Sequence, residues 1–240
     1  MSSPRYVLCI DPGFKNLGVA VVKVTGEEEP FYSGGFKGDT FEVVYVNVLG
    51  DEFSNEALYK SSNNFINTCI TYNKLAKCVD NFYSDTLCME SLSYSRNAAS
   101  NAKISMTLGA LSTFLLFGRT GDIEVVEAPP QTLKTLCCGS PSAEKEEVVA
   151  AVKSRFGPQL DKLLADSKII KSKHQHIYDA LSAFWLFDYK DAQRYTINKV
   201  TNEVKFTERK TKTSKSKRVP KVQKDSAALP VPRKRLKKVK

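Results

Sequence analysis

Four side chains that could bind a metal ion occupy unusual places in the sequence. Asp11 is the only carboxylate in the apolar run 6–22, and Glu90 closes another short apolar stretch. His176 and Asp179 are three residues apart, a spacing that places both side chains on one face of a helix. A carboxylate in apolar surroundings is costly unless a cation or a hydrogen-bond donor pairs with it. We therefore expect these four residues to converge on a cation.

Three carboxylates and one imidazole make a ligand set suited to Mg²⁺ or Mn²⁺, with one or two ions bound. Ions held in this way activate water and stabilise the leaving oxygen when a phosphodiester is cleaved. Asp11 has a plainer interpretation, because Asp-Pro-Gly is a common turn sequence. Glu90 could likewise simply end a strand, and Asp179 could be a solvated helix acid. The occurrence of all four residues in one chain favours the metal site.

The two histidines of the chain, His174 and His176, compete for the same role. Two positions apart on a helix correspond to a rotation of about 200°, so both cannot face one metal. The spacing to Asp179 favours His176 as the ligand. We expect His174 to pack near Tyr178 or to touch DNA.

The elements that must position these residues follow from the hydrophobic pattern. Strands are predicted at 6–11, 17–24, 41–50, 85–91 and 122–128, and helices at 54–82, 98–117, after the sequence PPQT, at 140–156 and at 172–190. This order predicts an α/β protein with a mixed five-stranded sheet flanked by helices. Asp11 and Glu90 end two strands that we expect to pair side by side.

The positive charge of the chain is concentrated at its end. Of 36 basic and 26 acidic residues, 15 and 3 lie in residues 201–240, which leaves 21 and 23 in the first 200. The last part is rich in Lys, Ser and Pro and poor in large apolar residues, so we expect residues 208–240 to be disordered. A run of one sign this dense attracts polyanions. It could contact DNA, bind a nuclear import receptor, or merely solvate the chain.

The remaining composition bounds the protein class. We expect a nuclease domain at 1–191, a short extension at 192–207 that could form a hairpin, and the basic tail at 208–240. No apolar stretch is long enough to cross a membrane, and the first residues lack the pattern of a secretory signal. The six cysteines contain no CxxC pair, which argues against a structural zinc site.

Four motifs in order resemble the RuvC family of Holliday-junction resolvases, in the RNase H-like superfamily. They are IDPGFKNLGVAVV, CMESLSYSRNAASNAKISMTLG, PPQTLKTLCCGSPSAEKEEVV and HQHIYDALSAFW. The resemblance implies that Asp11, Glu90, His176 and Asp179 are catalytic metal ligands. It also makes Lys134 and Lys145 catalytic phosphate contacts that neutralise charge on the scissile group; otherwise they are ordinary helix residues.

The segment after Glu90 offers further DNA contacts under this resemblance. Tyr94 could stack on bases at the open centre of a junction, although an exposed loop tyrosine without such a role is a close alternative. Arg96 and Lys103 are expected to contact the DNA backbone. The long interval between Asp11 and Glu90 and the basic tail depart from the family pattern. Large DNA viruses encode resolvases of this type, and the divergence would suit such a source.

The predicted helix 98–117 is apolar on two faces. One stripe contains Ile104, Leu108, Leu111 and Leu115, and the other contains Met106, Ala110, Phe114 and Phe117. A helix of this kind must bury both faces, one on the sheet and the other on a second subunit, unless it is a fully buried core helix. A two-fold homodimer would suit paired cuts in a four-way junction.

The resulting prediction is a Mg²⁺- or Mn²⁺-dependent endodeoxyribonuclease that resolves Holliday junctions by paired symmetric cuts. Two alternatives remain: another RNase H-like nuclease acting on forks, flaps or recombination intermediates, and a non-catalytic DNA-binding protein on the same fold. We expect the protein to act in the nucleus or at a cytoplasmic site of viral replication, and not to be secreted.

Overall fold

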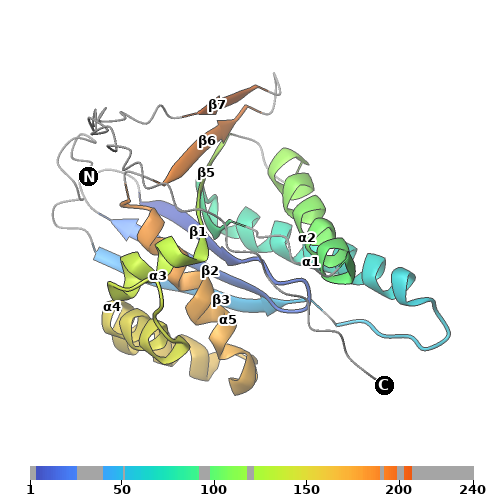
Figure 1. The fold of residues 1–240 in the computed structure, drawn as a ribbon, viewed down its shortest axis with the longest axis horizontal. Coiled ribbons are helices and arrows are strands. Elements are labelled where there is room, and N and C mark those ends of the chain that lie inside the picture. Colours follow the sequence, from blue (N-terminus) through green and yellow to red (C-terminus); the bar gives the residue numbers. More distant parts are fainter. Residues whose placement is uncertain are drawn as a thin grey trace, which may run out of the picture. The chain divides into compact units, whose positions relative to one another are not determined.

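The structure, a computed structural model, describes residues 4–25, 40–50, 52–91, 98–117, 122–189, 192–198 and 203–206. In this part of the chain one mixed sheet lies between two layers of helices (Figure 1), which confirms the predicted α/β class. The strands are β1 Arg5–Asp11, β2 Leu17–Thr25, β3 Thr40–Leu49, β4 Thr86–Glu90, β5 Ile123–Ala128, β6 Gln193–Ile197 and β7 Val204–Phe206. The helices are α1 Lys60–Phe82, α2 Ala98–Phe117, α3 Pro130–Cys138, α4 Lys145–Asp166 and α5 His174–Ser182, with 3-10 helices at Lys171–Lys173 and Ala183–Leu186.

The strands are ordered β3-β2-β1-β4-β5-β6-β7 across the sheet. Strands β1, β4 and β5 run parallel to one another, while β2 and β3 on one side and β6 and β7 on the other are paired antiparallel. The expected hairpin of the first two strands is present, and β1 pairs beside β4 as predicted. Because β1 and β4 are parallel, their carboxyl ends meet at the same edge of the sheet.

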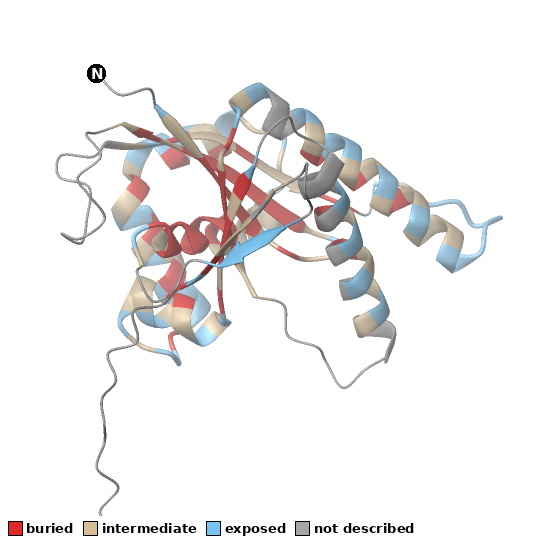
Figure 2. Ribbon diagram, turned by 90° about the horizontal axis from the view of Figure 1, so that it is seen from above, coloured by how far each residue is buried: buried red, intermediate tan, exposed pale blue. Residues whose placement is uncertain are grey.

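The two faces of the sheet follow the alternation of side chains along each strand. Cys9 of β1 and Cys88 of β4 point to the face covered by α3, α4, α5 and the second 3-10 helix. Leu8 and Leu87 point to the face covered by α1 and α2. Both faces of the sheet are buried, so the central strands carry apolar side chains on both sides. The buried residues gather along the sheet and along α5 and the second 3-10 helix (Figure 2).

The sheet has seven strands instead of the predicted five. The two additional strands, β6 and β7, pair antiparallel within the segment 192–207 and extend the sheet beside β5. Arg194 of β6 is buried, and its guanidinium donates to the carbonyl oxygens of Leu186 and Phe187 at 2.9 and 2.7 Å. The helical segment that was predicted to run to residue 190 ends at Leu186, so these last carbonyls can accept the bonds from Arg194. The bonds hold β6 against the main fold.

Several element boundaries also differ from the predictions. Helix α1 begins at Lys60 instead of residue 54, because the side chain of Asn63 binds the backbone of Asn55 and holds the preceding segment in a turn. Helix α4 does not end near Phe156. It kinks at Gly157, which has a φ of 54°, and continues to residue 166. Within the described residues no helix is long and apolar enough to span a bilayer.

Candidate metal centre

Asp11 is placed at the centre of the sheet edge by the strand that precedes it. Strand β1 is apolar and buried, and the Asp11 side chain, with 21% of its surface exposed, points to the same face as Cys9. The N–H of Gly13 donates to the Asp11 carbonyl at 2.8 Å and turns the chain sharply. A Cβ at Gly13 would lie 2.6 Å from the Asn16 carbonyl oxygen, so this tight turn requires glycine.

Glu90 lies beside Asp11 as a consequence of strand register. Ile10 of β1 pairs with Met89 of β4, so the next residue of each strand reaches the same edge of the sheet. Glu90 lies two residues after Cys88 on β4, so its side chain points to the same face as Cys88, toward the α3–α5 layer, as Asp11 does. The prediction that these two strand-end carboxylates are neighbours is confirmed by this pairing.

Helix α5 brings His176 and Asp179 onto the same edge. The Nδ1 atom of His176 lies 3.0 Å from Oδ2 of Asp11, and one ligand atom from each of Asp11, His176 and Asp179 lies within 4.8 Å of the other two. His174 is turned elsewhere, because its Nε2 atom lies 3.1 Å from the carbonyl oxygen of Ile169. The structure thus brings three of the four predicted ligands into one group and places Glu90 at the end of the adjacent strand.

Gly18, which the sequence analysis did not single out, permits this approach. It pairs directly with Asp11 in the β1–β2 ladder. A Cβ on Gly18 would clash with the backbone carbonyl of His176, so α5 can rest on β2 only because no side chain intervenes. A glycine inside an otherwise β-branched strand is a known sign of close backbone approach, and this signal was present in the sequence.

Burial and mutual repulsion raise the pKa values of two of these carboxylates. Burial, followed by the negative charges of Asp11 and Asp179, raises the pKa of Glu90 to about 7, while the Lys134 ammonium opposes the rise. Burial and Asp11 likewise raise the pKa of Asp179, against the Gln175 hydrogen bond and the charges of His176 and Lys145. Half-buried carboxylates that repel one another in this way are suited to share a divalent cation. The residues present therefore fit Mg²⁺ or Mn²⁺.

The two predicted phosphate-contacting lysines lie around these carboxylates. Lys134 lies on α3 and is close enough to Glu90 to affect its pKa, and Lys145 opens α4 and acts in the same way on Asp179. Gln175, another residue that the sequence analysis missed, donates from Nε2 to Oδ1 of Asp179 at 2.8 Å and holds that carboxylate in place. Its position four residues before Asp179 on one helix face was the available signal.

The remaining predicted DNA contacts are placed only in part. The Lys103 ammonium on α2 lies 6.0 Å from the centre of the Phe14 ring, in the turn after Asp11, so it lies at the rim of the candidate site. Tyr94 and Arg96 lie outside the described residues, as does the tail at 208–240.

Comparison with known proteins gives the chain its relatives. No protein-family model matches it. It is 27% identical over 144 residues to the crossover junction endodeoxyribonuclease RuvC of Pseudothermotoga lettingae, covering 60% of this chain and 75% of that protein. It is 24% identical over 177 residues to RuvC of Natranaerobius thermophilus, covering 72% of this chain and 95% of that protein.

The fold is similar to that of solved RuvC structures. RuvC of Thermus thermophilus superposes with a TM-score of 0.55 at 17% identity, over 79% of this chain and 99% of that one. The same protein in complex with a Holliday junction substrate gives 0.55 at 16% identity and the same coverage. The RNase H-like fold and the resemblance to RuvC-type resolvases, both predicted from the sequence, are confirmed.

Proposed function

We propose that this chain, which is similar to RuvC endonucleases in sequence and fold, is a structure-selective endonuclease that resolves four-way DNA junctions. The observation that carries the proposal is the meeting of Asp11, His176 and Asp179 within 4.8 Å at the edge where β4 ends in Glu90. Relatives whose names describe crossover junction cleavage favour this substrate over forks or flaps. The full ligand chemistry at the site argues against a non-catalytic DNA-binding protein.

The four acidic and imidazole side chains would hold one or two Mg²⁺ or Mn²⁺ ions. When bound, such ions activate water and stabilise the leaving oxygen of the phosphodiester. Asp11 and His176 orient one another through their 3.0 Å contact, and Gln175 orients Asp179. Glu90 takes up or releases a proton near neutral pH, since its pKa is raised to about 7, and it becomes a ligand only when deprotonated.

Lys134 and Lys145 supply positive charge from the helices that face the carboxylates. Their effect on the pKa values of Glu90 and Asp179 supports a role for both ammonium groups at the reacting phosphate. Charge that develops on the phosphate oxygens during hydrolysis would be stabilised by these cations.

The proposed enzyme acts as a homodimer, because a four-way junction needs two cuts related by a two-fold axis. Helix α2 supports this arrangement by its sequence, in which two apolar stripes need burial. Leu111 of the first stripe is buried against the sheet, and Met106 and Ala110 of the second are half-buried. We further propose that the basic tail, residues 208–240, contacts DNA or an import receptor.

Digestion of a synthetic four-way junction with Mg²⁺ tests the proposal. The wild-type chain should cut two opposed strands at symmetric positions, and Asp11→Asn should not. A fork, a flap and a linear duplex of the same sequence serve as controls. Preferential cutting of the fork or flap would replace the junction as substrate, and a wild-type protein that cuts none of them would contradict the enzymatic function.

A further inference from the structure

A short basic stretch precedes the helix that carries His176. Lys168, Lys171 and Lys173 lie in it, and no acidic residue occurs between Asp166 and Asp179. The first 200 residues as a whole are nearly balanced, with 21 basic and 23 acidic residues, so this concentration is local. Lys168 and Lys171 are exposed and Lys173 is half-buried.

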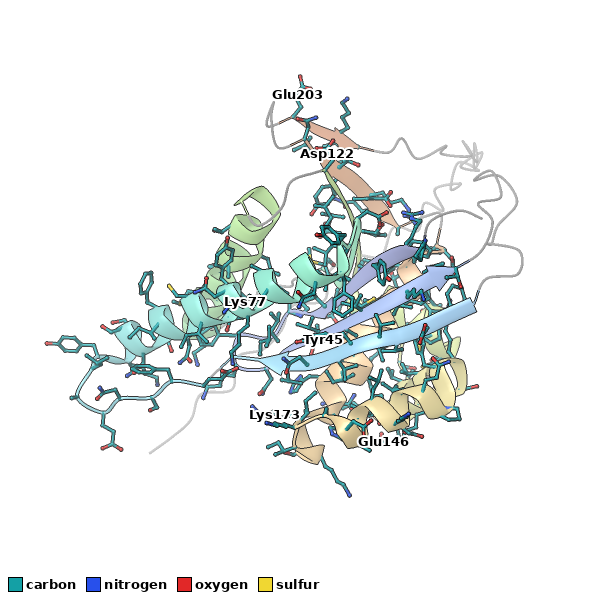
Figure 3. The ribbon with its side chains drawn as sticks, turned by 180° about the vertical axis from the view of Figure 1, so that it is seen from behind. Tyr45, Lys77, Asp122, Glu146, Lys173 and Glu203 are labelled. Carbon is teal, nitrogen blue, oxygen red and sulfur yellow. The ribbon has the colours of Figure 1, made fainter. Side chains whose placement is uncertain are left out.

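The stretch forms one wall of a groove of about 430 Å³. Residues 46–48 of the edge strand β3 form the opposite wall, and residues 167–170 and Lys173 line the basic side. Figure 3 shows Lys173 at the lower edge of the molecule, near the helices that cover this face of the sheet. The groove therefore combines an open depression with positive charge on one side.

Strand register links this groove to the candidate metal centre. Asp11 pairs with Gly18, and Gly18 pairs in turn with Val48, so the three residues form one row across β1, β2 and β3. Neighbouring strands lie about 4.8 Å apart, which places Val48 about 10 Å from Asp11. Val48 lies two residues after the buried Val46 on β3, so it points to the same face, toward the α4–α5 layer, as Asp11 does. The groove and the metal centre thus share one face of the sheet.

The basic stretch is held in a defined shape. His174 donates from Nε2 to the carbonyl oxygen of Ile169 at 3.1 Å, and the Lys173 N–H donates to the Ile170 carbonyl at 2.8 Å. The N–H of Ile169 donates to Oγ of Ser167 at 3.3 Å. These bonds fix the backbone between α4 and α5, so the lysines stand on an ordered turn. His174, for which the sequence suggested packing or a DNA contact, is a positioning residue of this turn.

We infer that the groove beside β3 binds backbone phosphates of the cleaved DNA strand, one or two nucleotides from the cut. The inference rests on the proposed function, which defines where the cut is. Successive phosphates of one strand are about 3.4 Å apart along the duplex axis but about twice that far apart in space, because the backbone winds around the axis, so 10 Å corresponds to one or two nucleotides. The chemistry of the groove fits this ligand, because lysine ammonium groups bind phosphate oxygens without reading the bases.

The test compares the full-length triple variant K168A/K171A/K173A with the full-length control K60A/K77A/K162A. The control removes three exposed lysines from α1 and α4. Junction affinity is measured over a range of salt concentrations in Ca²⁺. We expect binding of the triple variant to weaken about tenfold, with a salt slope shallower by about 0.9 for each phosphate that the variant no longer neutralises. The control should keep the wild-type slope.

A second measurement locates the phosphate. Junctions with one neutral methylphosphonate at each of the first six positions on either side of the cut are bound by wild type and by the triple variant. The neutral group should weaken wild-type binding at the first or second position on one side of the cut and have no effect there on the triple variant. An equal loss for both proteins, or an unchanged salt slope, would overturn the inference. If wild type binds the junction but never cuts it, the proposed function is contradicted instead. The comparison of salt slopes then still tests whether the groove binds phosphates.

Discussion

The backbone carbonyl of His176 rests directly against Gly18, with no space for a side chain between strand β2 and helix α5. Gly18 pairs with Asp11 on one side, so this contact sets the height of His176 above the first carboxylate. The 3.0 Å approach of His176 to Asp11 thus depends on a residue that has no functional group.

Gly18→Ala should displace α5 and separate His176 and Asp179 from Asp11. We expect destabilisation of about 1–3 kcal/mol, typical of an overpacked core, together with a large loss of junction cleavage. Urea denaturation and cleavage rates measure both effects. Gly109→Ala is the matched control, because a Cβ at Gly109 on α2 meets nothing within 4 Å. That variant should gain up to about 1 kcal/mol from helix propensity and cut normally. Equal behaviour of the two variants would refute the close-packing argument.

Asp11→Asn and Glu90→Gln should abolish cleavage while junction binding stays near the wild-type level. The reason is that affinity for branched DNA comes mostly from phosphate contacts, whereas the carboxylates bind the ions. Cleavage with Mg²⁺ and binding by gel shift are measured in parallel. If either variant cuts at near the wild-type rate, its carboxylate does not belong to the metal centre.

Glu90 should make the stability of the metal-free protein depend on pH. Its pKa is about 7 in the folded protein against 4.5 for the ordinary group. The folded state therefore binds the proton more tightly, and the resulting stability is present below pH 4.5 and lost as the pH rises through 7. Glu90→Gln should gain stability relative to wild type between pH 5 and 8 in EDTA.

The control for this pH effect is Glu146→Gln, in an exposed position on α4. It should follow the wild-type pH profile of stability. Mg²⁺ should stabilise wild type most above pH 7, where Glu90 is deprotonated and free to bind. A constant stability difference between Glu90→Gln and wild type from pH 5 to 8 would show that Glu90 is not perturbed.

The two histidines should separate by function. His176→Ala removes a ligand and should cut far more slowly, with partial recovery at higher metal concentration or with Mn²⁺. His176→Asp keeps a donor on the same helix face and should retain some activity. His174→Ala loosens the turn at Ile169 and should affect junction binding more than the rate at saturating enzyme. Cleavage rates of the three variants are measured over a range of metal concentrations. If His174→Ala is inactive and His176→Ala cuts normally, His174 and not His176 is the metal ligand.

The sequence by itself determined the central strands and the carboxylates that end them. Apolar runs that end at Asp11 and Glu90 predict strands because the preference is local and each strand is buried on both faces. The spacing of His176 and Asp179 predicts one helix face for the same reason. These features depend on neighbours in the chain, so the pattern of residues was sufficient.

Tertiary structure alone decided how these pieces meet. The contact between Asp11 and His176 joins residues 165 positions apart, and no local pattern specifies the height at which α5 crosses β2. That the possible hairpin at 192–207 joins the main sheet was also beyond local reading, because β6 is held by a buried Arg194 that binds carbonyls of the preceding helix end. The groove beside Val48 exists for the same physical reason: its two walls come from segments that only the packing of α5 on the sheet brings together.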